Sequence, residues 1–95
     1  MITVKVEFLG PYRLETGIAE TRCELPEGST LGDLLMALSE RFGAGIGALL
    51  LDAAGQVRQT MAVAVDGRIL PPDRTLSYRL QDGQTVLFLS PAMGG

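Results

Sequence analysis

The sequence predicts an α+β domain in which one main helix packs on one face of a mixed β-sheet. Three features indicate this class: an alternating apolar run at the start of the chain, an amphipathic stretch near its middle, and a strongly apolar run near its end. The 95 residues are enough for one domain with its own hydrophobic core. The predicted order of elements is ββαββ, which suits a sheet covered by a single helical layer.

The first two strands are predicted from periodicity and turn signals. Residues 2–8 place an apolar side chain at every second position, which is the period of a strand with one buried face. Gly10 and Pro11 end this strand. A second extended segment is expected near residues 18–25, where the turn residues 26–28 close it. These two segments form the predicted first pair of strands.

The main helix is predicted to begin after Thr30. The Thr30 hydroxyl can accept a hydrogen bond from the backbone three residues on, and Asp33 can reach back, which is a variant of the capping box. Gly43 is in the usual position for ending a helix. One apolar stripe follows the helix, and we expect it to pack on the sheet rather than to bind a partner. The stripe consists of Leu31, Leu34, Leu35, Leu38 and Phe42.

The second half of the chain contains the remaining strands. Residues 43–60 leave two alternatives open, a short helix or an extended connection. Residues 61–65 are typical of a buried strand, and Asp66-Gly67 of a tight turn to a short partner strand at 68–70. Residues 85–89 are apolar at four successive positions, which favours a central strand of the sheet.

Composition and charge argue against nucleic acid and membrane partners. The formal net charge is −3, and the eight basic residues are scattered singly along a chain with few aromatic side chains. No apolar run approaches the ~20 residues that a membrane-spanning helix needs. The start of the chain also lacks the pattern of a secretory signal. We therefore expect a cytoplasmic protein.

The residue types limit the chemistry that this chain can perform alone. It contains no histidine, so a Ser-His-Asp or Cys-His arrangement is excluded and a self-contained hydrolase is not expected. Cys23 is the only cysteine, so no intramolecular disulfide can form, and no metal site is expected. We interpret Cys23 as a small buried apolar residue. The acidic residues Asp66, Asp73 and Asp82 lie in predicted turns, where carboxylates commonly bond to the backbone.

The end of the chain differs from an ordinary strand terminus. Residues 90–95 contain no charged side chain and finish on Gly94 and Gly95. Two glycines at one end arise by chance in about one chain in 200, so the pair has weight only in its context. We expect residues 1–89 to form one domain and residues 90–95 to form a flexible C-terminal tail.

Period two in the last strand also predicts a partner surface. If Val86 and Phe88 face the core, Leu87 and Leu89 lie on the opposite face, where Leu9 joins them. Three such residues beside the tail predict a partner-binding patch. The alternative is that they are only partly exposed and pack under a loop.

Four short motifs, in order along nearly the whole chain, resemble those of the ubiquitin-like β-grasp sulfur carriers. That family includes the small subunit of molybdopterin synthase, the thiamine-pathway sulfur carrier and small archaeal and bacterial modifiers. The resemblance implies a ubiquitin-like β-grasp fold with a ββαββ mixed sheet. The motifs are Thr30-Leu31-Gly32-Asp33-Leu34-Leu35, Val63-Ala64-Val65-Asp66-Gly67, Leu80-Gln81-Asp82-Gly83-Gln84-Thr85-Val86 and the terminal Ser90-Pro91-Ala92-Met93-Gly94-Gly95.

The resemblance implies that the carboxylate of Gly95 is the reacting group, with Gly94 beside it. In this family a ubiquitin-activating-like adenylyltransferase uses ATP to adenylate that carboxylate, and a persulfide donor then converts it to a thiocarboxylate. Carried over to this chain, Pro91, Ala92 and Met93 would contact the partner together with the apolar patch. The chain would be a carrier rather than an enzyme and would bind no cofactor itself.

The resemblance leaves several roles open. We expect sulfur delivery in molybdopterin biosynthesis, with the large subunit of molybdopterin synthase as the acceptor. The alternatives are delivery in cysteine, tRNA-thiolation or thiamine pathways, protein modification through isopeptide bonds of Gly95, and a plain interaction domain without carboxylate chemistry. Two departures bear on the choice of pathway: Asp66 stands where many relatives have Asn, and one proline, Pro91, precedes the end where molybdopterin-synthase subunits often have two.

Overall fold

The fold was obtained as a computed structural model that describes residues 1–58 and 60–90. It contains five strands, three α-helices and one turn of 3-10 helix in these residues. In chain order they are β1 (Ile2–Phe8), α1 (Pro11–Thr16), β2 (Glu20–Leu25), α2 (Leu31–Phe42), α3 (Ala44–Leu50), β3 (Ala62–Val65), β4 (Arg68–Ile69), η1 (Pro72–Arg74) and β5 (Thr85–Leu89).

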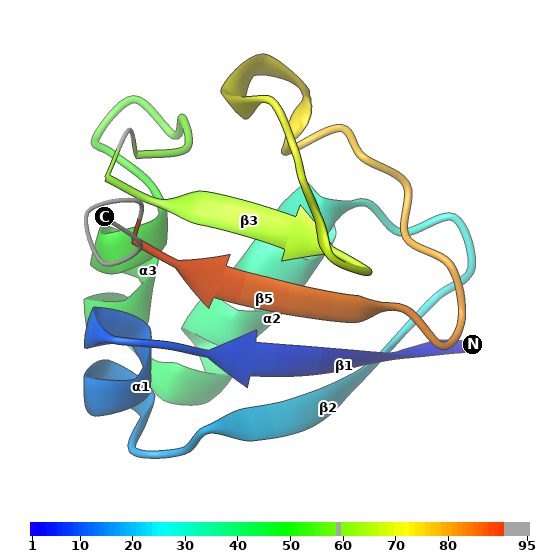
Figure 1. Cartoon of the computed structure of the whole chain (residues 1–95), viewed down its shortest axis with the longest axis horizontal. Helices are drawn as coiled ribbons and strands as arrows, with labels where there is room; N and C mark the ends of the chain where they lie inside the picture. Colours follow the sequence, from blue (N-terminus) through cyan, green and yellow to red (C-terminus); the bar gives the residue numbers. More distant parts are fainter. Residues whose placement is uncertain (59, 91–95) are drawn as a thin grey trace.

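The five strands form one mixed sheet in the order β2-β1-β5-β3-β4. β1 and β5 are parallel, and every other pair is antiparallel. Helix α2 crosses behind the sheet, while α1 and α3 stand at one end of it (Figure 1). The predicted mixed sheet with one main helix on one face is therefore confirmed, and no helix of the described residues covers the opposite face.

The core lies between the sheet and α2. β1 alternates as predicted, with Val4 and Val6 fully buried, and the apolar stripe of α2 faces them. β5 contributes Val86 and Phe88, and the Phe88 ring stacks on Phe8 with centroids 6.1 Å apart. Burying such side chains contributes roughly 1.5 to 3 kcal/mol each to the free energy of unfolding.

The first turn of α2 carries the predicted capping box. The Thr30 hydroxyl accepts from the Asp33 N–H at 3.3 Å, and the Asp33 carboxylate accepts from the Thr30 N–H at 2.8 Å. The next free N–H groups, of Leu31 and Gly32, donate to carbonyls of Tyr78 and Leu76. A Cβ on Gly32 would lie 3.2 Å from the Leu76 carbonyl oxygen, so glycine permits this close approach.

Two short helices, α1 and α3, add to the elements that the sequence predicts. α1 was not predicted, because its six residues give too short a pattern; Pro11 at its start and Gly17 in the left-handed conformation at its end delimit it. α3 resolves the choice left open for residues 43–60 in favour of a helix over Ala44–Leu50. α3 packs against α2 and α1, so tertiary contacts stabilise a segment that holds two glycines.

The capping box provides a test of this fold. Replacing Thr30 with Ala removes the hydroxyl acceptor and should lower the free energy of unfolding by about 1 kcal/mol, measured by urea denaturation. Thr30→Ser keeps the hydroxyl and should lose much less. Equal losses in the two variants would contradict the capping role, because both lose the same methyl group.

Candidate functional site at the end of strand β5

β5 is the central strand of the sheet, and the start of this strand is fixed on both sides. On one side, Asp82 accepts from the Thr3 N–H at 2.8 Å, and the Gly83 N–H donates to the Thr3 carbonyl at 2.9 Å. On the other side, Asp66 and Thr85 exchange two hydrogen bonds of 2.9 Å, one of them to the Asp66 carboxylate. The start of β5 is thus tied to β1 and to the turn that follows β3.

The turn at Asp66-Gly67 requires left-handed backbone at both residues. Their φ angles are 50° and 84°, and Asp66 is the only non-glycine residue in the described ranges with positive φ. Aspartate tolerates this conformation better than most residues, and here its carboxylate also bonds to Thr85. Asp66 and Asp82 therefore have structural roles, as the sequence predicted for turn carboxylates.

The other end of β5 points toward α1 and α3. Phe8 is paired with Phe88, and the Leu9 N–H donates to the Phe88 carbonyl at 3.1 Å, so β1 and β5 end at the same edge of the sheet. Ser90 is the last residue described, and it is half-buried. The predicted reacting end and the predicted tail contacts lie outside the described residues and stay predictions. They are Gly94 and Gly95, with Pro91, Ala92 and Met93.

The predicted partner patch lies on the open face of the sheet. Leu87 and Leu89 point away from the core, as the alternation predicts, and both are half-buried. Leu9 is 42% exposed beside them. Their role in partner binding stays a prediction, but the structure gives their neighbours.

The apolar surface extends further across the sheet than the sequence indicated. Leu89 is paired with Ala62, Leu87 with Ala64, and Ala64 with Ile69 of the edge strand β4. Ile69 is 65% exposed. Sequence reasoning missed this residue because a two-residue strand gives no periodicity from which to assign a face. We call this surface the apolar strip, and it consists of Leu9, Ala62, Ile69, Leu87 and Leu89, with Ala64, which is itself buried, between Leu87 and Ile69.

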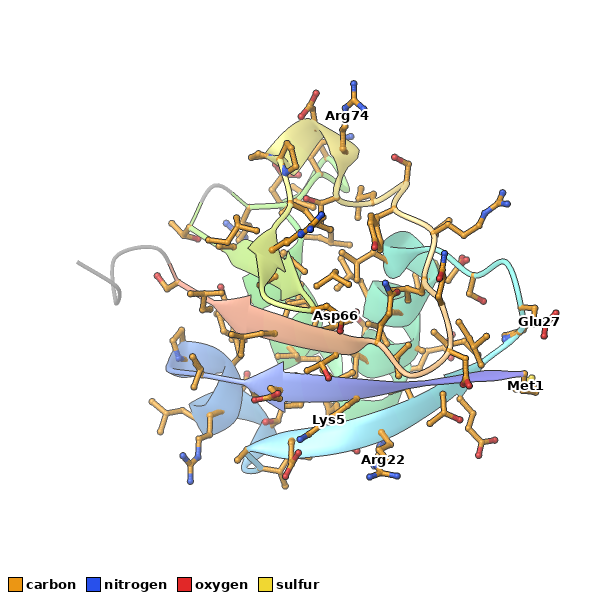
Figure 2. All side chains as sticks on the ribbon, turned by 45° about the vertical axis from the view of Figure 1, so that its right-hand side comes forward. Met1, Lys5, Arg22, Glu27, Asp66 and Arg74 are labelled. Carbon is orange, nitrogen blue, oxygen red and sulfur yellow. The ribbon has the colours of Figure 1, made fainter. Side chains whose placement is uncertain are left out.

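The other half of the open face is charged. Lys5 of β1 is paired with Arg22 of β2, and both side chains project from this part of the sheet (Figure 2). The Lys5 ammonium lies 2.9 Å from the Glu20 carboxylate, and this hydrogen bond and charge raise the pKa of Lys5. The open face is therefore divided into a charged half over β1 and β2 and an apolar half over β5, β3 and β4.

Cys23 lies in the core, as the sequence predicted. Its side chain is 8% exposed on β2, opposite Val4. Burial raises the pKa of the Cys23 thiol, and the nearby Arg41 opposes this only in part. A thiol with a raised pKa supplies little thiolate near neutral pH, so this environment does not activate a nucleophile.

Residues 1–58 and 60–90 also lack the features of a resident metal site. They contain no group of three or more acidic, cysteine or histidine side chains placed to hold an ion. None of the helices in these ranges combines the length and the apolar character needed to cross a membrane. The candidate functional site is thus the end of β5, with the apolar strip beside it.

A comparison with known protein families shows to which family the chain belongs. The sequence model of the ThiS family matches residues 6–95, which is nearly the whole chain. The chain belongs to the ThiS family. This is a family of ubiquitin-like sulfur carriers and modifiers, as the four motifs indicated. No curated protein matches the sequence.

Solved structures of other proteins share the fold of this ThiS family member. SAMP1 from Haloferax volcanii has a TM-score of 0.83 at 17% identity, covering 98% of this chain and 99% of that one. Urm1 from Trypanosoma brucei has a TM-score of 0.77 at 25% identity, covering 98% and 95%.

A third similar structure is a complex. A chain in the complex of subunits 1 and 2 of molybdopterin-converting factor from Helicobacter pylori has a TM-score of 0.64 at 22% identity, covering 99% of this chain and all of that one. These matches confirm the ubiquitin-like β-grasp fold.

The environment of Cys23 leads to a test of its structural role. In the folded protein, a thiol-alkylating reagent at pH 7 should modify Cys23 at least about tenfold more slowly than in urea, because the thiol is buried and its thiolate is disfavoured. Because the pKa is raised, the folded-state rate should still be increasing at a pH above the ordinary thiol value of about 8.5. Intact mass spectrometry measures both rates, and equal rates at pH 7 would contradict the assignment.

Proposed function

We propose that this ThiS family member is a sulfur carrier whose Gly95 carboxylate is adenylated and then converted to a thiocarboxylate. The observation that carries the proposal is that the family match continues through Gly95, directly beyond the central strand β5. In this proposal Gly94 and Gly95 form the reacting end, and the catalytic groups belong to partner enzymes. The chain itself binds no cofactor, and ATP is consumed by the activating enzyme.

The chemistry explains why a carboxylate needs activation first. A carboxylate oxygen attacks the α-phosphorus of ATP, and pyrophosphate leaves. A sulfur nucleophile from a persulfide donor then attacks the carbonyl carbon, and AMP leaves with the electron pair of the broken C–O bond. Reduction of the remaining S–S bond by a thiol yields the thiocarboxylate. Glycine suits this end because it has no Cβ to crowd the phosphate and can take backbone angles closed to other residues.

The apolar strip supports a docking role beside the reacting end. The similar subunit 1 and 2 pair of molybdopterin-converting factor is a protein complex. For this chain we propose that the ubiquitin-activating-like adenylyltransferase covers Leu9, Leu87 and Leu89, with Ile69 at the edge. Pro91, Ala92 and Met93 would then enter the enzyme with the carboxylate. Because activation consumes ATP, we also propose a cytoplasmic location.

Among the acceptors, we propose the large subunit of molybdopterin synthase. The likeness to a chain of the molybdopterin-converting factor complex supports this choice. A second candidate is protein modification through isopeptide bonds of Gly95, which the likeness to SAMP1 favours. Lys5 is the only lysine, and it is paired with Glu20, so chains built from copies of this protein are not expected.

Intact mass distinguishes these candidates. After incubation with a ubiquitin-activating-like enzyme, ATP and a persulfide donor, the chain should gain the mass difference of one sulfur replacing one oxygen. Adducts on lysines of other proteins would favour the modifier instead. A variant lacking Gly95 should give neither product. As a positive control, the activating enzyme should modify its own cognate carrier. If that control succeeds and the mass of this chain is unchanged, the carrier proposal is falsified.

The docking role of the apolar strip is tested separately. Ile69→Asp places a charge on an exposed edge residue, and Leu89→Ala trims a half-buried one, so each should weaken binding to the activating enzyme about tenfold or more, measured by calorimetry. Thr85→Ala is the matched control, since Thr85 lies on the same strand and face beside the charged half. Unfolding in urea separates lost binding from lost stability. Unchanged affinity in both variants would remove the strip from the interface.

A further inference from the structure

Leu14 is the most exposed of the large apolar side chains that the structure describes. It lies on α1 and is 86% exposed, compared with 42% for Leu9 and 65% for Ile69. Single exposed leucines are ordinary features of protein surfaces and need no partner. Leu14 differs because the surface on both sides of it is hollowed.

The larger hollow is a groove between α1 and α3 of about 500 Å³. The α3 side of this groove is formed by Leu49 and by two small residues, Gly45 and Ala48, and a Cβ on Gly45 would clash with the Glu15 carboxylate. A second hollow, of about 440 Å³, lies on the other side of Leu14. We call the first hollow the α1–α3 groove, and it is lined by Pro11, Leu14, Glu15, Gly45, Ala48 and Leu49.

Helices α1 and α3, whose residues line the groove, stand at the end of the molecule where β5 finishes (Figure 1). α1 begins two residues after Leu9, whose N–H is bonded to the Phe88 carbonyl. The Tyr12 ring of α1 also packs against Phe88, with centroids 6.3 Å apart. The groove therefore lies at the same end of the molecule as Leu9 and the end of β5.

The length of chain beyond Ser90 limits where a partner can be. Five residues follow Ser90, and an extended chain spans at most about 3.6 Å per residue, so the Gly95 carboxylate is at most ~18 Å from Ser90. An enzyme that encloses this carboxylate therefore brings its own surface within about that distance of Ser90, near the end of the domain that holds α1 and α3. An apolar groove at that end is thus within the region that such an enzyme covers.

We propose that the α1–α3 groove is a second contact area for the enzyme that adenylates Gly95, and that Leu14 inserts into an apolar hollow of that enzyme. The inference rests on the proposed function and extends it beyond the sheet surface. Arg13 and Glu15 flank Leu14, so the groove fits a partner surface that has an apolar centre and carries both signs of charge at its rim. Docking energy of this kind lowers the KM for the carrier and leaves kcat unchanged, because it acts equally in the ground and transition states.

Steady-state kinetics with varied carrier concentration tests the proposal. Leu14→Asp should raise the KM for the carrier about 10- to 100-fold and leave kcat within about twofold. Ala48→Trp, which fills the groove from the α3 side, should also raise KM. Met36→Asp is the matched control: Met36 is 63% exposed on α2, away from the groove, and its substitution should change neither constant.

Each outcome separates this inference from the proposed function. If the wild-type chain is not adenylated at all, the proposed function fails. If the wild type is adenylated but Leu14→Asp and Ala48→Trp retain the wild-type KM, only the groove inference is overturned. If Leu14→Asp abolishes a concentration-dependent dimer, detected by light scattering, without changing KM, the groove is an interface between two copies and the inference is also overturned.

Discussion

The parallel pairing of β1 with β5 joins the two halves of the sheet. It places the most apolar strand at the centre of the sheet, where the side chains of Val86 and Phe88 are covered by α2. It also brings both strands to an end at the same edge, which is where α1 begins and β5 finishes. Parallel strands cannot be joined by a tight turn, so the chain between them forms the remaining elements of the domain.

The two ends of β5 have opposite roles. At its start, the turn residues Asp66, Asp82 and Gly83 hold the strand by hydrogen bonds to both sides. These bonds give a physical reason for two of the four motifs, the one that ends at Asp66-Gly67 and the one that contains Asp82-Gly83. The residues of these two motifs hold the central strand in register and take no part in the proposed chemistry. At its other end, the strand leads to the proposed reacting group. Because only five residues separate Ser90 from Gly95, the position of β5 limits how far the proposed reacting carboxylate can lie from the domain. This limit favours a partner that docks on the domain itself.

Much of this arrangement could be predicted from sequence, because long periodic segments specify their own faces. The alternation in β1 and β5 and the capping box at Thr30 are confirmed. α1 could not be predicted, since six residues give no periodicity and the helix is held by contacts with distant segments, such as Tyr12 on Phe88. The pairing of Ile69 with Ala64 and the groove beside Leu14 depend on contacts between distant segments. Local sequence therefore indicated the strand that leads to the site but not the full surface around it.

The proposed sulfur-carrier function depends on the free carboxylate of Gly95 as the reacting group. ATP–pyrophosphate exchange catalysed by a ubiquitin-activating-like enzyme tests it most directly, because exchange requires reversible adenylation of that group. The comparison is between the native chain and the same chain with its terminus converted to a carboxamide, which leaves every side chain in place. We expect exchange with the native chain and none with the carboxamide. Equal exchange with both would show that another group is adenylated and would contradict the claim.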